Sequence, residues 1–473
     1  MSATYDLVVI GSGPGGQKAA IQGAKAGWRV AVIEREAKVG GACVYTGTIP
    51  SKTLREAALT LLAVRRSAKF LSGTLEAQTK ISTLMHRLDE VLAAHGRFIR
   101  RFFETNGVTV VHGRARLVDA HTIEVQSVAG ARQRLTARHI VIASGSRPRN
   151  PPNVPVDHES ILDSDSILGM HYLPRSLTVL GGGVIATEYA TIFSLLGVKV
   201  TMIDAGPRPL GFIDPELVDR FLRHFTTHGG TWLGRRTLES VSLGPLGEVV
   251  AQLAGGETVV SDKMLCALGR SANVEDLGLG AAGILQGKYG VIAVDAHYET
   301  NVPGVYAVGD VIGPPALAST SMEQGRRAVC HALGRDPGSA FAVVPTGIYA
   351  VPEIASVGLT EAQVREKHGG VLVGRCEFSE VARAHIAGDD SGMLKLLTAP
   401  DGGRLLGAHA VGEGATDLIH VGEMAILNGN DVSVFLENIF NFPTLGEAYR
   451  IAALNLRNQV TSYAPAGPAA VWA

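Results

Sequence analysis

Short apolar runs alternate with helix-favouring stretches along the first part of the chain. The run at residues 5–10 predicts a buried strand, and the Ala-rich stretch at residues 17–26 predicts a helix. A second apolar run at residues 29–33 predicts the next strand. This alternation is typical of an α/β fold built on a nucleotide-binding sheet.

The turn between the first strand and the first helix has the pattern GxGxxG. Its glycines are Gly11, Gly13 and Gly16, and Glu34 follows the second strand. In such a turn the first glycine permits the tight bend, the second lets a pyrophosphate approach the backbone, and the third lets helix and strand pack closely. The helix N-terminus adds amide donors and a positive dipole. We therefore expect a dinucleotide here, with Glu34 on its adenosine ribose. The alternative, a structural turn and a surface acid, fits the flanking elements less well.

A second copy of this pattern begins at residue 176. The apolar run at residues 176–180 leads into Gly181 and Gly183, Ala186 takes the third position, and the next strand ends in Asp204. Two copies in one chain imply two dinucleotides bound at once. A flavin needs this arrangement to receive a hydride from NAD(P)H.

Asp204 bears on which nicotinamide nucleotide binds. A carboxylate at this position accepts a hydrogen bond from the 2'-hydroxyl of NAD and repels the 2'-phosphate of NADP. Arg208 could bind that phosphate, or it could be a solvated loop arginine. The sequence leaves the preference between NAD(H) and NADP(H) open.

Apolar periodicity continues toward the C-terminus. Short alternating runs at residues 108–135 predict a β-meander, and a run at residues 139–143 predicts a buried strand. Four prolines at residues 148–155 mark a domain boundary. Helices are predicted at residues 54–66, 82–106, 418–428 and 432–436, and further strands at residues 393–398 and 407–411.

Composition narrows the function classes. The 473 residues include 46% apolar residues, 18% charged residues and 57 glycines, which fits a compact α/β enzyme of several domains. A net charge of -1 argues against nucleic acid or an anionic membrane as partner. The four cysteines lie far apart, with neither metal-ligand spacing nor a disulfide framework. No apolar stretch reaches the roughly 18 residues of a spanning helix, so we expect a soluble protein with small-molecule partners and no metal.

Residues 40–55, GGACVYTGTIPSKTLR, resemble the redox segment of the flavin-dependent pyridine nucleotide-disulfide oxidoreductases. Family members carry two cysteines here, separated by four residues, that form a disulfide beside the flavin. In this chain Cys43 occupies the first position and Thr48 the second. A hydroxyl forms neither a disulfide nor a thiolate, so dithiol chemistry is excluded. Cys43 is then a remnant, a weak redox sensor or, more simply, a small packed residue.

Two later segments extend the resemblance to about residue 458. Residues 298–313 resemble the second flavin motif, which implies that Asp310 binds the ribityl or phosphate region of FAD. A helix expected from Ala318 would direct its N-terminal amides toward the flavin. Near the C-terminus the family has a histidine that serves the dithiol of the other subunit, and Phe442 stands at that position. A phenyl ring cannot shuttle protons.

Within the family, the chain resembles the soluble, Si-specific NAD(P) transhydrogenases, which lack the same two groups. This implies FAD, a cytoplasmic homodimer, and ping-pong hydride transfer between NADPH/NADP+ and NAD+/NADH without a redox disulfide. Lys52 and Glu188 occupy positions that pair beside flavin N5 in the family, where the lysine stabilises reduced flavin. Further cofactor-binding residues that we expect are Arg35, Gly41, Thr48, Ser144, Gly145, Gly269 and Gly309.

The implied architecture is two Rossmann-like nucleotide-binding domains, for FAD and NAD(P), and a C-terminal α+β dimerisation domain. The expected segments are the FAD-binding residues 1–150 and 274–344, the NAD(P)-binding residues 151–273, the dimerisation residues 345–461 and a disordered tail at residues 462–473.

Two other functions fit the same scaffold. A reductase of quinones or other acceptors would use the same FAD and NAD(P)H, and no sequence feature excludes it. A non-catalytic FAD/NAD-binding redox sensor is the second alternative, and the presence of Lys52 and Glu188 argues against it. A disulfide reductase would need cysteine at Thr48 and histidine at Phe442.

Overall fold

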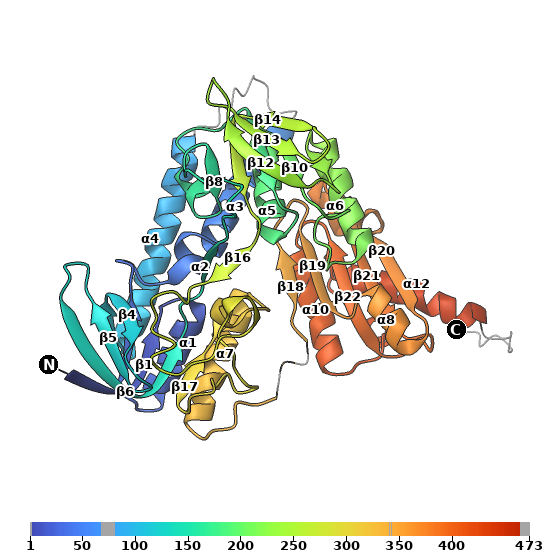
Figure 1. Ribbon diagram of the computed structural model, residues 1–473. Helices are drawn as coiled ribbons and strands as arrows, with labels where there is room; N and C mark the ends of the chain where they lie inside the picture. The colour runs from blue at the N-terminus through green and yellow to red at the C-terminus, as the bar shows by residue number, and fades with distance from the viewer. Residues whose placement is uncertain (1, 68–80, 340, 342, 464–473) are drawn as a thin grey trace. The chain divides into compact units, whose positions relative to one another are not determined.

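The computed structural model describes residues 2–67, 81–339, 341 and 343–463. The chain divides into two compact units, the first made of residues 1–173 and 265–339 and the second of residues 174–264 and 340–473 (Figure 1). Each unit is thus assembled from two separate stretches of sequence. The finer four-segment division expected from the sequence stays a prediction.

A seven-stranded sheet forms the centre of the first unit, in the order β3-β2-β1-β6-β5-β4 with β17 also paired to β6. Strand β1 (Ser2–Ile10) is parallel to β2 (Val30–Glu34) and to β6 (Arg132–Ile142). Strand β17 (Val305–Ala307) is parallel to β6. All residues of β2 are buried, as expected for a parallel sheet covered on both faces. The carboxyl ends of β1 and β2 therefore present Gly11 and Glu34 at one edge of the sheet.

The predicted meander at residues 108–135 is wrong in its first part. Strand β3 (Thr109–His112) pairs in parallel with β2 and belongs to the nucleotide-binding sheet. Only β4 (Arg114–Leu117) and β5 (Thr122–Gln126) run antiparallel and join β6. Alternation of apolar residues predicts a half-buried strand but does not identify its neighbour.

Helices cover the sheet of the first unit. Helix α1 (Pro14–Lys25) packs on α7 (Ala318–Ala332) so closely that a Cβ on Gly325 would lie 2.1 Å from the carbonyl oxygen of Gly15. Leu7 and Val9 point toward these helices, and the alternate residues of β1 face the opposite core. The other elements of this unit are α2 (Gly41–Tyr45), α3 (Thr48–Ser67), α4 (Ile81–Thr105), β7 (Ser146–Pro148), β8 (Ile161–Asp163) and β16 (Arg270–Ala272), and β15 (Lys263–Cys266) spans the sequence boundary between the units.

The second unit begins with the second nucleotide fold. Strands β9 (Ser176–Leu180), β10 (Lys199–Ile203) and β11 (Thr231–Leu233) are parallel, with β10 in the middle. Helix α5 (Val184–Leu195) follows β9, and its buried residues fill most of its length. The remaining elements of this stretch are helix α6 (Pro215–Thr227) and the antiparallel strands β12 (Leu238–Leu243), β13 (Val249–Leu253) and β14 (Thr258–Ser261).

The C-terminal part of the second unit is an antiparallel sheet in the order β18-β19-β22-β21-β20, with helices packed on it. Helix α12 ends at Tyr463, so it continues two residues into the stretch expected to be a tail, and residues 464–473 lie outside the described part of the chain. The elements are β18 (Thr346–Ile348), β19 (Ile354–Gly358), α8 (Glu361–His368), β20 (Leu372–Glu377), α9 (Ala382–Ala387), β21 (Met393–Thr398), β22 (Leu405–Val411), α10 (Ala415–Leu427), α11 (Val434–Glu437) and α12 (Glu447–Tyr463).

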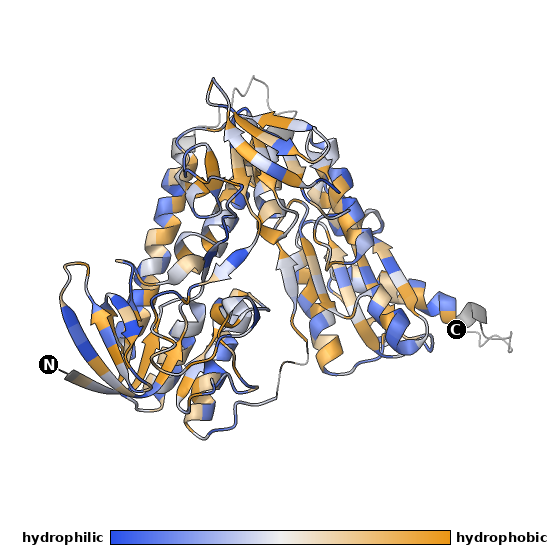
Figure 2. Cartoon of the chain, viewed as in Figure 1, coloured by the Kyte–Doolittle hydropathy of each residue, from blue (hydrophilic) through white to orange (hydrophobic). Residues whose placement is uncertain are grey.

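Apolar residues concentrate on the strands of the sheets, while the long helices carry mixed faces (Figure 2). Among the described residues, no helix combines the length and apolar character needed to cross a lipid bilayer.

Candidate nucleotide and flavin sites

The first glycine turn has the geometry of a phosphate cradle. Gly11 has φ +103°, and a Cβ on Gly16 would lie 2.0 Å from the carbonyl oxygen of Gly11, so both positions require glycine. A Cβ on Gly13 would meet no heavy atom within 4 Å. The backbone at Gly13 therefore faces open space at the start of α1, as the predicted pyrophosphate site requires.

Ser12 joins this turn to the acid after β2. Its backbone N–H and its hydroxyl both donate to Glu34 Oε2, at 3.0 and 2.5 Å, and its Oγ accepts from Gly40 N at 2.8 Å. Glu36 N donates to Glu34 Oε1 at 3.0 Å. Oε2 already accepts two hydrogen bonds and Oε1 accepts one, so Glu34 can still accept from a ribose hydroxyl through Oε1. Arg35, also expected at this site, is exposed and pairs with Glu36 at 3.0 Å.

The redox segment starts directly against the glycine turn. Gly41 has φ +65°, and a Cβ there would lie 2.9 Å from the Cα of Gly13. Cys43 is a free thiol in helix α2. Burial raises the pKa of the thiol, and a hydrogen bond with the Thr48 hydroxyl offsets only part of this increase. Cys43 is therefore protonated at neutral pH. Lys52 lies in α3 and donates to Ser51 Oγ at 3.4 Å.

Asp310, in the second flavin motif, is held by a chain of polar contacts. The hydroxyl of Ser146 donates to Asp310 Oδ2 at 2.6 Å. Arg270 Nε donates to the same hydroxyl oxygen at 2.7 Å, and Arg270 Nη2 donates to the Ser146 carbonyl at 2.8 Å. Arg270 also lies 3.8 Å from Asp165, whose pKa is raised by burial. These contacts therefore hold the Asp310 carboxylate in one orientation.

The loop after β6 is fixed in a similar way. Ser144 Oγ donates to the carbonyl of Asn273 at 2.8 Å, and Asn273 Nδ2 donates back to the Ser144 carbonyl at 2.9 Å. Gly145 has φ +70° with open space at its Cβ position. Gly309 has φ +77°, and its N–H donates to Gln324 Oε1 at 2.8 Å. As predicted, α7 begins at Ala318.

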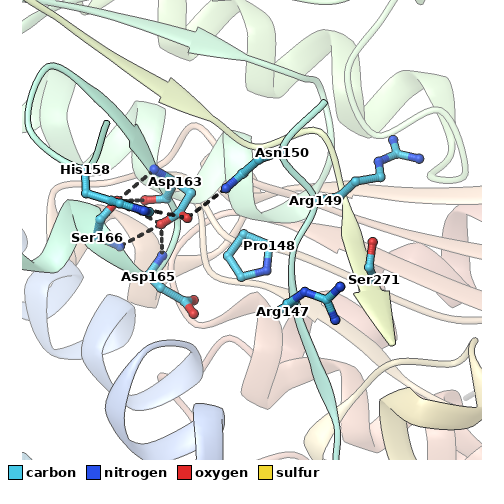
Figure 3. A pocket seen from close by; sticks show the side chains of 9 residues that line it. All are labelled: Arg147, Pro148, Arg149, Asn150, His158, Asp163, Asp165, Ser166 and Ser271. Carbon is cyan, nitrogen blue, oxygen red and sulfur yellow. Dashed lines mark hydrogen bonds and ion pairs between the residues drawn. The ribbon is translucent and has the colours of Figure 1, made fainter. Parts of the chain in front are cut away.

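A cavity of about 660 Å³, lined mainly by polar and charged residues, opens beside the paired strands β7 and β16 (Figure 3). Hydrogen bonds from Ser166 hold the pKa of Asp163 below its usual value, although burial opposes them. On the other wall, Arg147 makes a bidentate pair with Glu275 at 2.7 and 2.6 Å. The charge of Arg147 is thus compensated. The lining residues are Arg147, Pro148, Arg149, Asn150, His158, Asp163, Asp165, Ser166 and Ser271.

The second glycine turn repeats the geometry of the first. Gly181 has φ +112°, and a Cβ on Gly183 would meet nothing within 4 Å. Asp204 follows β10 and accepts from Gly206 N through Oδ1 at 2.6 Å. Arg208 pairs with Asp219 of α6 at 2.7 Å. The backbone at Gly183 thus faces open space, binding of a dinucleotide there stays a prediction, and Arg208 is ion-paired.

Glu188 is buried in α5, with 4% of its surface exposed. Its Oε1 accepts from the backbone N–H of Tyr349 at 2.9 Å, and one turn later Thr191 Oγ1 accepts from Val351 N at 3.1 Å. The segment before β19 therefore fixes the orientation of the Glu188 carboxylate. Lys52 and Glu188 belong to different units, so their pairing stays a prediction.

Comparison with known proteins agrees with this geometry. A family model described as pyridine nucleotide-disulphide oxidoreductase matches residues 5–325, and one described as the dimerisation domain of the same family matches residues 344–453. The chain belongs to the pyridine nucleotide-disulphide oxidoreductases. Enzymes of this family depend on FAD, and the mixed α/β fold predicted from the sequence is confirmed.

Similar curated members of the family carry a more specific name. A protein of Mycobacterium bovis (strain BCG / Pasteur 1173P2) named soluble pyridine nucleotide transhydrogenase is 41% identical over 459 residues, 96% of this chain and 98% of that protein. A protein of the same name from Vibrio vulnificus (strain YJ016) is 41% identical over 462 residues, with the same coverage.

Solved structures of the family also superpose on the chain. LpdA from Mycobacterium tuberculosis gives a TM-score of 0.89 at 27% identity, over 96% of this chain and 99% of that one. The HOCl-induced flavoprotein disulfide reductase RclA from Escherichia coli gives 0.86 at 26% identity, over 95% and 100%.

The motifs of the family do not contain every residue that shapes these sites. Ser12 stands at a variable position of the glycine pattern, and Ser146 and Arg270 each follow an expected residue by one position. Their importance depends on tertiary contacts, across 22 and 28 residues for Ser12 and across more than a hundred for Ser146 and Arg270, which no local pattern reveals. Among the described residues, no cluster of three metal-ligating side chains occurs.

Proposed function

We propose that this chain is a soluble, cytoplasmic, FAD-dependent transhydrogenase. It passes a hydride between NADPH/NADP+ and NAD+/NADH on the si face of the flavin. The observation that carries the proposal is the pair of open glycine turns, at Gly13 and Gly183, in a chain whose redox segment has a single cysteine. The 41% identity to proteins named soluble pyridine nucleotide transhydrogenase supports it.

FAD, when bound, supplies the two-electron acceptor and donor. Residues of the first unit would hold its parts: the amides at Gly13 would bind the pyrophosphate, Glu34 would accept from the adenosine ribose, and Asp310 would bind the ribityl or phosphate region. The backbone would approach the cofactor at four positions, Ser144, Gly145, Gly269 and Gly309. The N-terminus of α7, at Ala318, would place the positive end of the helix dipole beside the pyrimidine end of the flavin.

Lys52 and Glu188 serve the hydride transfer. The ammonium of Lys52 stabilises negative charge that develops when the flavin is reduced, and Glu188 keeps the ammonium oriented. The hydrogen bond from Tyr349 N to Glu188 Oε1 supports this role because it holds the carboxylate in one orientation. The two nicotinamide nucleotides use one site in turn, so the reaction is ping-pong.

Disulfide reduction is not part of the proposed reaction. The Cys43 thiol is protonated at neutral pH, because burial raises its pKa, and it shares a hydrogen bond with Thr48 where a second sulfur would be needed. Phe442 is 66% exposed and offers no proton acceptor. With dithiol chemistry excluded, bound FAD would pass its electrons as a hydride to the second nucleotide.

The active species is a homodimer in this proposal. The second unit carries the dimerisation domain of the family, and its helix α10 exposes Val421, Met424 and Leu427 on neighbouring turns. Apolar side chains at this spacing form a stripe along one helix face. An exposed apolar stripe of this kind marks an interaction surface, and here a second copy of the chain would cover it.

The experiment that tests the proposal compares acceptors. Flavin-loaded protein is given NADPH with thio-NAD+ or with a naphthoquinone, and we expect faster turnover with thio-NAD+. Faster turnover with the quinone would support an acceptor reductase instead. If neither NADPH nor NADH bleached the flavin, the redox-sensor function would be supported.

The role of Lys52 is tested separately with Lys52→Met. Loss of the ammonium should slow flavin reduction by NADPH by roughly 10- to 100-fold, because the charge on reduced flavin is no longer balanced. Stopped-flow absorbance of the reductive half-reaction measures this rate. Lys25→Met, an exposed change at the end of α1, is the control. An unchanged rate in Lys52→Met would remove the proposed role.

A further inference from the structure

Three arginines gather at the carboxyl ends of two neighbouring strands in the second unit. Strands β10 and β11 are parallel partners, so the loops that leave them lie at the same edge of the sheet. The loop after β10 carries Asp204 and Arg208, and the loop after β11 carries Arg235 and Arg236. In a fold of this type, the adenosine ribose of the nucleotide lies at this edge.

Backbone hydrogen bonds hold the two loops together. Asp204 N donates to the carbonyl of Leu233 at 3.1 Å, and Arg236 N donates to the carbonyl of Asp204 at 3.0 Å. Arg235 N donates to the carbonyl of Gly206 at 2.9 Å. The backbone of Arg235 is therefore fixed beside the segment that carries the ribose-binding acid.

The partners of the three guanidinium groups differ. Arg208 makes two contacts to Asp219, at 2.7 and 3.3 Å, and Arg236 Nε lies 2.6 Å from Glu257 Oε2. The exposed side chain of Arg235 has no hydrogen-bond or ion-pair partner among the residues that the structure describes. Of the three, Arg235 is the one whose charge is not already paired with a carboxylate among the described residues.

The backbone at Arg235 is also unusual. Its φ of +57° is rare for a residue with a side chain, and such conformations persist where the surroundings hold them and cluster at binding sites. The preceding Gly234 lets the two loops approach, since a Cβ there would lie 3.0 Å from the carbonyl oxygens of Gly206 and Pro207. The loop is therefore built to present Arg235 at this edge.

We propose that Arg235 binds the 2'-phosphate of NADP(H), while Asp204 accepts from the 2'-hydroxyl of NAD(H). This inference rests on the proposed use of both nucleotides at one site. The positive charge of Arg235 offsets the repulsion that Asp204 alone would exert on the phosphate. Arg208 is the weaker candidate, because two nitrogens of its guanidinium already donate to Asp219.

Calorimetric titration of the FAD-loaded protein with 2',5'-ADP and with 5'-AMP tests the inference without any hydride transfer. In Arg235→Gln the dissociation constant for 2',5'-ADP should rise about five- to tenfold, as expected for loss of one charged hydrogen-bonding group at a partly exposed site. Binding of 5'-AMP should stay unchanged, which also shows that the site is folded. Added salt should weaken 2',5'-ADP binding more in the unmodified protein than in the variant.

The matched controls are Arg236→Gln and Arg208→Gln. Each should bind 2',5'-ADP within about twofold of the unmodified protein, because the arginine that it removes is already paired with a carboxylate. Unchanged 2',5'-ADP affinity in Arg235→Gln would overturn the inference, as would a larger loss in either control. Because these probes carry no nicotinamide, a failure of transhydrogenation and a failure of this assignment give separate results.

Discussion

Ser146 connects two groups that lie far apart in the sequence, Arg270 and Asp310. Its hydroxyl accepts from the guanidinium and donates to the carboxylate, so removing it affects both. In Ser146→Ala, we expect a folded protein that binds FAD about tenfold more weakly, because Asp310 loses its orienting donor. Equilibrium titration of the apoprotein with FAD, followed by flavin fluorescence, measures the change.

The control for this prediction is Ser242→Ala, an exposed change on β12 of the second unit. It should leave FAD affinity unaltered. Equal affinities in Ser146→Ala and the unmodified protein would show that Asp310 needs no support from Ser146.

His139 makes the first unit sensitive to acid. Its ring stacks on Trp28 at 5.0 Å, and neither ring nitrogen has a partner among the described residues. Burial, with a smaller contribution from Arg138, lowers its pKa below the usual 6.5. The folded state therefore binds this proton less readily than the unfolded state, and stability decreases as the pH falls below about 6.5.

The variant His139→Phe should lose this part of the acid sensitivity, because a phenyl ring keeps the stack and takes no proton. Between pH 7.5 and 5.5, its melting temperature should fall less than that of the unmodified protein. The exposed change His171→Phe serves as control and should leave the pH dependence as it is. A parallel fall in all three proteins would contradict the assignment.

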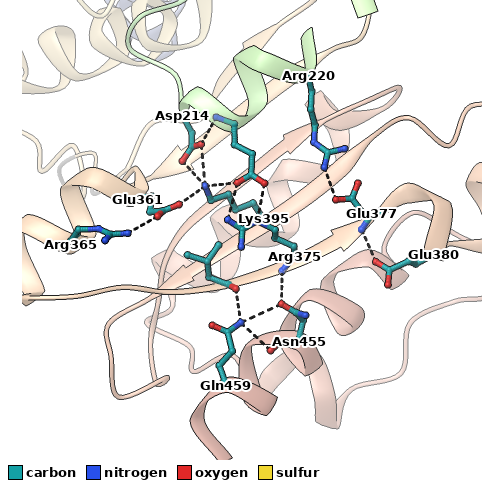
Figure 4. Close-up of polar contacts among 12 residues, drawn as sticks. Asp214, Arg220, Glu361, Arg365, Arg375, Glu377, Glu380, Lys395, Asn455 and Gln459 are labelled. Carbon is teal, nitrogen blue, oxygen red and sulfur yellow. Dashed lines mark hydrogen bonds and ion pairs between the residues drawn. The ribbon is translucent and has the colours of Figure 1, made fainter. Parts of the chain in front are cut away.

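At the scale of elements, a buried lysine joins the two segments of the second unit (Figure 4). Lys395 on β21 is 1% exposed. Its Nζ lies 3.0 Å from Asp214 Oδ2, 2.9 Å from Glu216 Oε2 and 2.7 Å from Glu361 Oε2. Asp214 caps helix α6 by accepting from Glu216 N, so the lysine ties the start of that helix to the C-terminal sheet.

In Lys395→Met, these carboxylates lose their shared cation, and we expect the free energy of unfolding to fall by about 3–5 kcal/mol. Urea denaturation of the flavin-loaded protein measures it. Arg365→Met removes a 65% exposed partner of Glu361 from the same network and should cost less than about 1 kcal/mol. Similar losses in the two variants would show that burial of the lysine does not determine its contribution.

The same network predicts the direction of acid sensitivity. Burial opposes ionisation of Glu216, but hydrogen bonds from Arg375 and Lys395 lower its pKa to about 2. Its contribution to stability is therefore present above pH 4.5 and is lost as the pH falls toward 2.

The elements also show where sequence reasoning succeeds. Strand β9 begins where the apolar run before the second glycine turn places it, because local pattern determines such starts. Helix α7 begins at Ala318, as the resemblance to the second flavin motif implied. Strand β3 was misplaced because its pairing with β2 is a long-range choice. The contacts of Ser12 and Ser146 were missed for the same reason, since each depends on tertiary neighbours.

At the scale of the whole molecule, the exposed stripe on α10 predicts how copies associate. Met424 and Leu427 are 55% and 46% exposed. Replacing both with glutamate places unpaired charges on that face. Burying these charges in an interface would cost more free energy than burial of the remaining apolar surface provides. We expect sedimentation velocity to show monomers for Met424→Glu/Leu427→Glu at concentrations where the unmodified protein is dimeric.

Leu246→Glu, a charge added at a position that is 93% exposed, is the control and should leave the dimer intact. A dimer that persists in the double variant would place the interface elsewhere on the second unit.

The family and the order of its segments could be predicted from the motifs, whereas the relation between Lys52 and Glu188 could not. These residues stand 136 positions apart (188 minus 52) in different units, and only the family resemblance joins them. Substrate choice was left open for a similar reason, because Arg235 follows a strand that carries no motif.

One anaerobic experiment tests the central claim most directly. The bound flavin is bleached with one equivalent of NADPH, the NADP+ is removed, and thio-NAD+ is added while flavin and thio-NADH absorbance are followed together. The proposed function predicts that flavin reoxidation and thio-NADH formation proceed at the same rate and in equal amounts. Flavin that stays reduced, or reoxidises only when air or a quinone is admitted, would contradict transhydrogenation.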